Sequence, residues 1–146
     1  MNRISDRFLQ LGVLGAVVGL GLGVWMGATE NFTLRGVHVH INLLMWVSML
    51  LYGIVYRVLP RAAEGKLPAL HFWTNVVGVL TMLPLLTLLF LGAAGTPVAG
   101  MTPDKVGPLL GVSTVVVWLS MLMFAVIVFR ATSRAKAGAE DMKQAA

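Results

Sequence analysis

The sequence of 146 residues contains no cysteine and few charged residues, and both absences narrow what the chain can be. Without cysteine, a disulfide scaffold, an iron–sulfur cluster, a thiolate metal site and covalent cofactor attachment through a Cys-x-x-Cys-His motif are all excluded. Only 12% of the residues are charged whereas 58% are hydrophobic, and the mean hydropathy is +0.84. This composition excludes a disordered chain and an ordinary soluble domain.

Long uncharged runs account for the high hydropathy. Residues 8–28 include no charged residue, and a helix of this length reaches about 31 Å, which matches the hydrocarbon core of a bilayer. Three similar runs follow, and glycine and proline residues separate them. The sequence therefore predicts an all-α fold, an integral-membrane four-helix bundle that forms a single domain over residues 1–146. The predicted spans cover about residues 8–28, 37–59, 70–91 and 106–129.

The basic residues are distributed unevenly between the ends of these spans. A net charge of +5 can indicate nucleic-acid binding in a polar protein, but here it is better explained by membrane topology, and we expect no nucleic-acid partner. The connection between the first and second spans and that between the third and fourth spans carry only Arg35 and Lys105. The two termini and the connection between the second and third spans carry nine basic residues: Arg3, Arg7, Arg57, Arg61, Lys66, Arg130, Arg134, Lys136 and Lys143. The asymmetry predicts that both termini are cytoplasmic and that residues 130–146 form a cytoplasmic tail, either a frayed helix end or disordered.

Four glycines recur every fourth residue in the first predicted span: Gly15, Gly19, Gly23 and Gly27. On a helix they form one continuous stripe, which allows close approach of another smooth or flat surface. In membranes that surface is usually a second helix, packed through a small-xxx-small pattern. The alternative is the face of a flat cofactor such as haem, and we favour helix packing.

His38 and His40 lie just inside the outer end of the second predicted span, where ionisable residues are functional candidates. Positions two apart differ by about 200° around a helix axis, so the two side chains are expected on nearly opposite faces. They are suited to two different partners and not to chelating one ion. A neutral imidazole in an apolar bundle can be an axial ligand of haem iron. Hydrogen bonds to neighbouring helices, or a place in the headgroup layer, explain the position of the pair equally well.

His71, the third histidine, begins the third predicted span beside Phe72 and Trp73. It is expected a full membrane thickness away from His38 and His40. We interpret it as a residue of an aromatic belt at the membrane interface.

The second predicted span contains a sequence pattern that is more specific than the pair His38 and His40 alone. It resembles the tenth helix of the catalytic subunit of haem-copper oxidases, in the branch of the C-type oxidases and nitric oxide reductases. The pattern consists of His38-Val39-His40 followed in register by Trp46, Val47, Met49, Gly53, Tyr56 and Pro60. The next segment, Leu70-His71-Phe72-Trp73 with Gly78, is similar to the start of the following helix in that family. The resemblance covers about half the chain, residues 37–91.

The resemblance implies a cofactor and its ligands. In that family the first histidine of the pair binds the high-spin haem and the second binds the low-spin haem, from opposite faces of the helix. Carried over, His38 and His40 are the expected haem-iron ligands and haem b is the expected cofactor. Arg35, one turn earlier, is placed to meet haem propionates, or alternatively lipid headgroups. The chain lacks the family's copper-binding histidines and its twelve helices, so we do not expect a monomer to reduce oxygen.

The number of axial haem ligands that one chain can supply predicts a homo-oligomer. If His38 and His40 face apart, one chain cannot supply both axial ligands of one haem, and a six-coordinate haem has to be shared between subunits. The family's subunit contains three quasi-equivalent four-helix arcs, which favours a homotrimer over a dimer as the homo-oligomer.

A methionine-based metal-handling role is less favoured, because methionines within the spans are explained by packing.

We therefore interpret the chain as a haem b protein of the bacterial cytoplasmic membrane that transfers electrons or binds O2 or NO, with a respiratory-chain redox partner. The alternative is a non-catalytic accessory or assembly partner of a haem-copper oxidase. Whether the protein is an enzyme stays open; if it is one, a haem-dependent oxidoreductase is expected.

Overall fold

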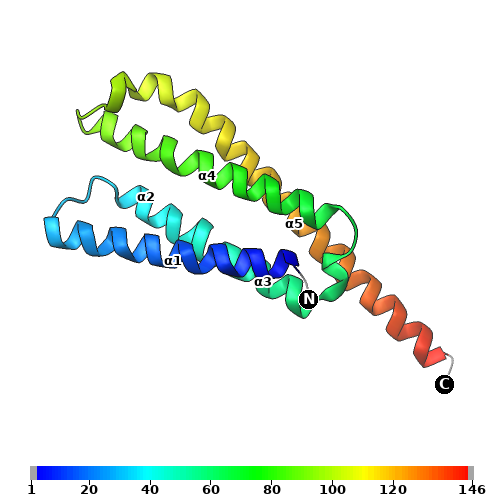
Figure 1. Cartoon of the computed structure of the whole chain (residues 1–146). Helices are drawn as coiled ribbons and strands as arrows, with labels where there is room; N and C mark the ends of the chain where they lie inside the picture. The colour runs from blue at the N-terminus through cyan, green and yellow to red at the C-terminus, as the bar shows by residue number, and fades with distance from the viewer. Residues whose placement is uncertain (1–2, 145–146) are drawn as a thin grey trace.

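The computed structural model describes residues 3–144, with side chains up to Ser133, and all regular structure in that range is helical. The elements are α1 (Arg3–Thr29), α2 (Arg35–His40), the π-helix η1 (Ile41–Ser48), α3 (Met49–Val58), the 3-10 helix η2 (Pro60–Ala63), α4 (Leu67–Ala93), the 3-10 helix η3 (Val98–Gly100) and α5 (Pro103–Gln144) (Figure 1). The prediction of an all-α fold is confirmed.

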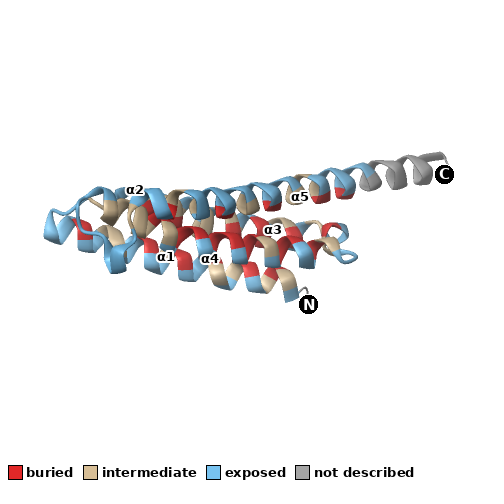
Figure 2. Cartoon of the chain, turned by 90° about the horizontal axis from the view of Figure 1, so that it is seen from above, coloured by how far each residue is buried: buried red, intermediate tan, exposed pale blue. Residues whose placement is uncertain are grey.

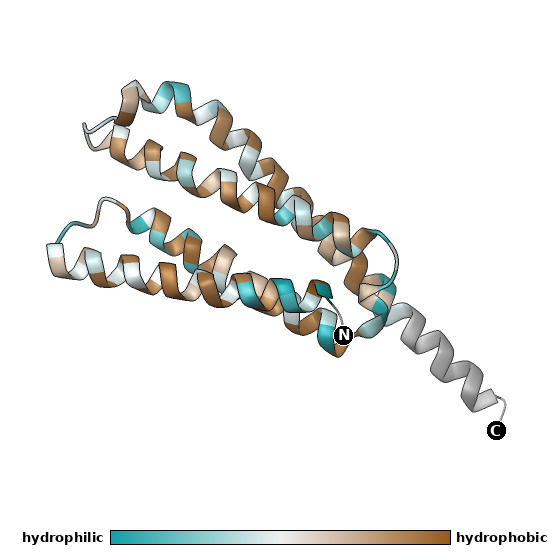
Figure 3. Ribbon diagram, viewed as in Figure 1, coloured by the Kyte–Doolittle hydropathy of each residue, from teal (hydrophilic) through white to brown (hydrophobic). Residues whose placement is uncertain are grey.

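Four helical segments of the described chain are long and apolar enough to cross a membrane: Arg3–Thr29, Arg35–Val58, Leu67–Ala93 and Pro103–Ser133. Hydrophobic residues recur along most of each one (Figure 3). The four runs predicted as spans are helical, and α1 and α5 continue into polar flanks, where backbone hydrogen bonds do not depend on side-chain polarity. Their insertion in a membrane stays a prediction. α5 runs as one helix to Gln144, so residues 130–144 extend the last span as a helix. Residues 145–146 of the predicted tail lie outside the described residues.

The four spans form two helical hairpins. α1 packs along the continuous rod made by α2, η1 and α3, while α4 packs along α5. The two hairpins are in contact near both ends: the Tyr52 ring of α3 lies 4.8 Å from the His71 ring of α4, and α2 packs on α4 where Gly36 faces Phe90 (Figure 1). α1 begins and α5 ends at the same end of the bundle, as four antiparallel spans require (Figure 1). That this end faces the cytoplasm stays a prediction.

The buried residues follow the inner faces of α1, α3 and α4 (Figure 2). Phe8, Met49, Tyr56 and Val79 are at most 1% exposed and form the centre of this core. The outer faces are also apolar, as a lipid-facing surface requires; Phe129, for example, is 72% exposed.

The glycine stripe lies between α1 and the second span. A Cβ at Gly15 would lie 2.7 Å from the backbone carbonyl carbon of Met45, and one at Gly19 would lie 2.7 Å from the Asn42 Oδ1. These distances are shorter than any real contact, so the prediction of helix packing is confirmed for this part of the stripe. Gly27 does not take part, because nothing lies within 4 Å of its Cβ position. Gly19 faces Asn42 and Gly23 faces His38, so each step of four residues along α1 corresponds to a step of four back along the second span. The residue opposite Gly27 would be number 34, which precedes the start of α2 at Arg35.

Candidate functional site

His38 and His40 belong to α2, the short helix that opens the second span. The π-helix η1 begins at the next residue, Ile41. The Ser48 hydroxyl, at the end of η1, donates a hydrogen bond of 2.7 Å to the Leu43 carbonyl, five residues earlier. π-helical turns are rare and occur frequently at functional sites, so this departure from α-helical geometry marks the segment beside the histidine pair.

The His38 imidazole is held against α1. Its Nδ1 lies 2.9 Å from the carbonyl oxygen of Gly19. A carbonyl oxygen can only accept a hydrogen bond, so this contact assigns the hydrogen to Nδ1 and the lone pair to Nε2. The Asn42 Nδ2 is 3.3 Å from Nδ1 and 3.4 Å from Nε2. The Asn42 amide is therefore within hydrogen-bond distance of the His38 Nε2, and a metal ion at Nε2 would have to displace it.

The His40 imidazole is held by its own helix. Its Nδ1 lies 2.8 Å from the carbonyl oxygen of Gly36, one turn earlier, and the same reasoning leaves the Nε2 lone pair available. Metal-binding histidines in proteins commonly have their second ring nitrogen fixed in this way, because the hydrogen bond orients the ring and raises its basicity. His38 and His40 therefore share the tautomer that ligation through Nε2 requires.

The two rings lie on different sides of the second span. A Cβ at Gly23 would lie 2.8 Å from the His38 Cε1, which places this ring against α1. His40 follows Gly36 by one turn, and the Gly36 Cβ position faces the Phe90 ring of α4. His38 and the Gly36 face, which His40 follows by one turn, have different neighbouring helices, as two-residue spacing predicts, so one chain is not expected to direct both imidazoles at a single iron atom.

Arg35 is the first residue of α2 and is exposed at the membrane edge closest to the histidine pair. Its backbone N–H donates to the carbonyl oxygen of Phe32 over 3.0 Å. This location leaves the guanidinium group available to an anion, and the choice between a haem propionate and a lipid headgroup stays a prediction.

Imidazole is a donor that haem iron takes, so the space beside the two rings decides whether one chain could hold the group. A nearby apolar groove of about 330 Å³ lies between α1, the second span and α4, but it is lined by apolar side chains such as Val37, Ile41 and Leu83 and by neither histidine. α1 also closes the inner edge of His38. This groove therefore does not place a haem against either imidazole, and shared ligation between subunits stays a prediction.

Sequence reasoning was wrong about His71. It is 0% exposed and lies inside the bundle, so it is not part of an outward-facing aromatic belt. Its Nδ1 is 2.9 Å from the Tyr56 hydroxyl oxygen. Its ring centroid lies 4.8 Å from that of Tyr52, 5.2 Å from that of Phe8 and 5.4 Å from that of Phe124. The spacing of His71, Asn75 and Val79, each four residues apart on the buried stripe of α4, was the signal that could have revealed this position.

Asn75 extends the buried polar group one turn along α4. Its Nδ2 donates to the Ser120 Oγ over 3.0 Å, which joins α4 to α5. His71 Nε2 and Asn75 Oδ1 are buried and have no hydrogen-bond partner within the described part of the chain. His71 and Phe90, which faces Gly36, are nineteen residues apart on α4, or about 28 Å. The predicted separation of His71 from the histidine pair is therefore confirmed.

Among the residues whose side chains are described, no group of three or more histidine, aspartate or glutamate side chains converges as a metal site. A comparison of the chain with family models, curated proteins and solved structures found no match. The likeness to haem-copper oxidases consequently rests on the sequence pattern, and membership of that family stays a prediction.

Proposed function

We propose that this chain is a multi-pass membrane haem b protein that transfers electrons or binds a diatomic gas, with His38 and His40 as the haem-iron ligands. One observation carries the proposal: each imidazole has Nδ1 within hydrogen-bond distance of a backbone carbonyl oxygen, which favours the tautomer whose Nε2 can be a ligand. When bound, haem supplies a one-electron Fe(III)/Fe(II) couple and, if one axial position is open, a site for O2 or NO.

The chain contributes orientation and exclusion of water. The carbonyl groups of Gly19 and Gly36 fix the two rings, and the absence of a Cβ at Gly23 allows His38 to lie against α1. The exposed apolar faces of the spans limit the access of water to the ligands. The Arg35 guanidinium can form a bidentate pair with a carboxylate group at the membrane edge.

Single replacements of the histidines test the site. We expect His38→Ala and His40→Ala each to remove one axial ligand. A haem that does not bind carbon monoxide in the wild type is then expected either to bind it or to be released from the protein. The measurement is the dithionite-reduced absorption spectrum with and without carbon monoxide, with Leu43→Ala as a control because Leu43 is 56% exposed on the same span. Unchanged haem content and an unchanged spectrum in both histidine variants would show that the ligands lie elsewhere.

The assembly that fits this site is a homotrimer in which His38 of one subunit and His40 of the next hold each haem. The mass of the detergent-purified protein, corrected for bound detergent, is expected to be three times that of the 15.7 kDa chain, with one haem per chain. A dimer would retain shared ligation with a different symmetry. A monomer that holds a six-coordinate haem would contradict shared ligation.

A further inference from the structure

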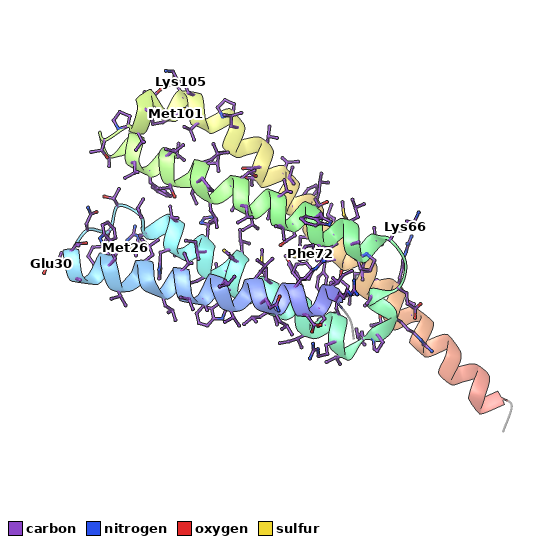
Figure 4. All side chains as sticks on the ribbon, in the orientation of Figure 1. Met26, Glu30, Lys66, Phe72, Met101 and Lys105 are labelled. Atoms are coloured by element: carbon purple, nitrogen blue, oxygen red, sulfur yellow. The ribbon has the colours of Figure 1, made fainter. Side chains whose placement is uncertain are left out.

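A pocket of about 410 Å³ lies at the basic end of the bundle, between η2, the beginning of α4 and α5. Its floor is apolar and buried, with Ala62 at 3%, Ile127 at 4% and Ala131 at 4% exposure. Its rim consists of charged side chains, namely Arg61, Glu64, Lys66 and Arg130. Lys66 lies on the loop that leads into α4, close to α5 (Figure 4).

The rim is positively charged and not neutralised. Three cations from η2, the loop and α5 surround the pocket with a single carboxylate, that of Glu64. Among the residues whose side chains are described, the only ion pair joins Arg57 and Asp6, which lie outside this rim. α4 also begins here, and its N-cap residue Lys66 makes no side-chain capping hydrogen bond. The helix N-terminus adds to the positive potential of the three cations.

The pocket is continuous with an apolar groove. Arg61 and Ala131 line both this pocket and a second one of about 280 Å³, which is completed by Leu59 and Pro60. Arg130 directly follows Phe129, which is 72% exposed on the apolar surface of the last span. The charged rim therefore stands at the depth where hydrocarbon meets headgroups in a bilayer.

We propose that this pocket binds the phosphate of an anionic phospholipid, with one acyl chain in the groove beside Leu59 and Pro60. Arginine guanidinium groups match phosphate oxygens in a bidentate geometry, and lysine adds a point charge. Free phosphate would contact only the charged side chains of the rim, whereas a phospholipid would contact the rim with its phosphate and fill the apolar groove with an acyl chain. Basic pockets between spans on one side of a membrane are suited to such headgroups.

Lipid affinity of charge variants tests the proposal. The full-length protein in detergent is given equal amounts of dioleoylphosphatidylglycerol and dioleoylphosphatidylcholine, and bound lipid is counted by native mass spectrometry. We expect phosphatidylglycerol to be preferred and Lys66→Gln/Arg130→Gln to weaken its binding about 30-fold. Arg3→Gln/Lys105→Gln removes two exposed cations outside the pocket and is the matched control; its phosphatidylglycerol affinity is expected to stay within about twofold of wild type.

Glu64→Gln provides a test that loss of folding cannot imitate, because removal of the carboxylate is expected to tighten phosphatidylglycerol binding about fivefold. Equal binding of the two lipids, or equal effects of the pocket and control variants, would overturn the proposal. An excess of inorganic phosphate is added in a separate arm. Complete displacement of phosphatidylglycerol by inorganic phosphate would show a free-anion site and would also overturn it.

Discussion

Replacement of His71 by alanine is expected to lower the free energy of unfolding by about 3–5 kcal/mol. His71 is fully buried, and its ring is surrounded by Phe8, Tyr52, Tyr56 and Phe124 from three other helices. Alanine would remove the hydrogen bond to Tyr56 and would leave a cavity where these helices meet. Lipid does not refill such a cavity, because it lies inside the bundle.

The measurement is reversible unfolding in mixed micelles, followed by circular dichroism. Leu70→Ala is the matched control, because Leu70 is adjacent on α4 but 53% exposed, and its loss is expected to change stability by less than about 1 kcal/mol. His71→Phe keeps a ring in the cluster while removing the hydrogen bond to Tyr56, so an intermediate loss of about 1–2 kcal/mol is expected. Equal stability of His71→Ala and Leu70→Ala would contradict the burial of His71.

Gly15→Ala is expected to destabilise the protein by about 2–3 kcal/mol. The new Cβ would lie 2.7 Å from the Met45 carbonyl carbon and 2.8 Å from the Trp46 backbone nitrogen. Both atoms belong to backbone and cannot rotate away, so α1 and η1 would have to separate along their interface. The displacement would also weaken the nearby contact between His38 and Gly19.

Gly21→Ala is the control on the same helix, since nothing lies within 4 Å of its Cβ position. Alanine is a better helix former than glycine by about 0.5–1 kcal/mol, so this variant is expected to be neutral or slightly stabilised. The midpoints of unfolding of the two variants in one detergent provide the comparison. If Gly15→Ala is as stable as Gly21→Ala, the stripe does not form the contact between α1 and the second span.

The four long apolar helical segments could be predicted because the length of an apolar run determines whether a helix can cross a bilayer. Their ends could not, since α1 continues to Arg3 and α5 to Gln144 on backbone hydrogen bonding in polar sequence. The π-helix η1 was also beyond prediction. Its residues, Ile41–Ser48, form a wider turn while packed against α1, and no composition signal distinguishes them from an α-helix.

The candidate site was predicted in its residues and in its direction, because two-residue spacing on an α-helix turns side chains to opposite faces. The partner that positions His38 could not be predicted, since the Gly19 carbonyl comes from another helix, nineteen residues earlier in the chain. His71 was misplaced for a related reason. Its neighbours Phe72 and Trp73 suggested an interface, but Phe72 is 5% and Trp73 57% exposed, so adjacent residues face opposite environments.

Haem content is the most direct measurement of the function proposed for His38 and His40. The wild type and the double variant His38→Ala/His40→Ala are purified side by side after expression with added haem precursor, and the pyridine haemochrome is quantified per chain. We expect about one haem b per wild-type chain, fewer than one in ten double-variant chains with haem, and the same helical content in both. Equal haem in the two proteins would contradict the assigned ligands. The absence of haem from a folded wild type would favour the role of an accessory or assembly partner.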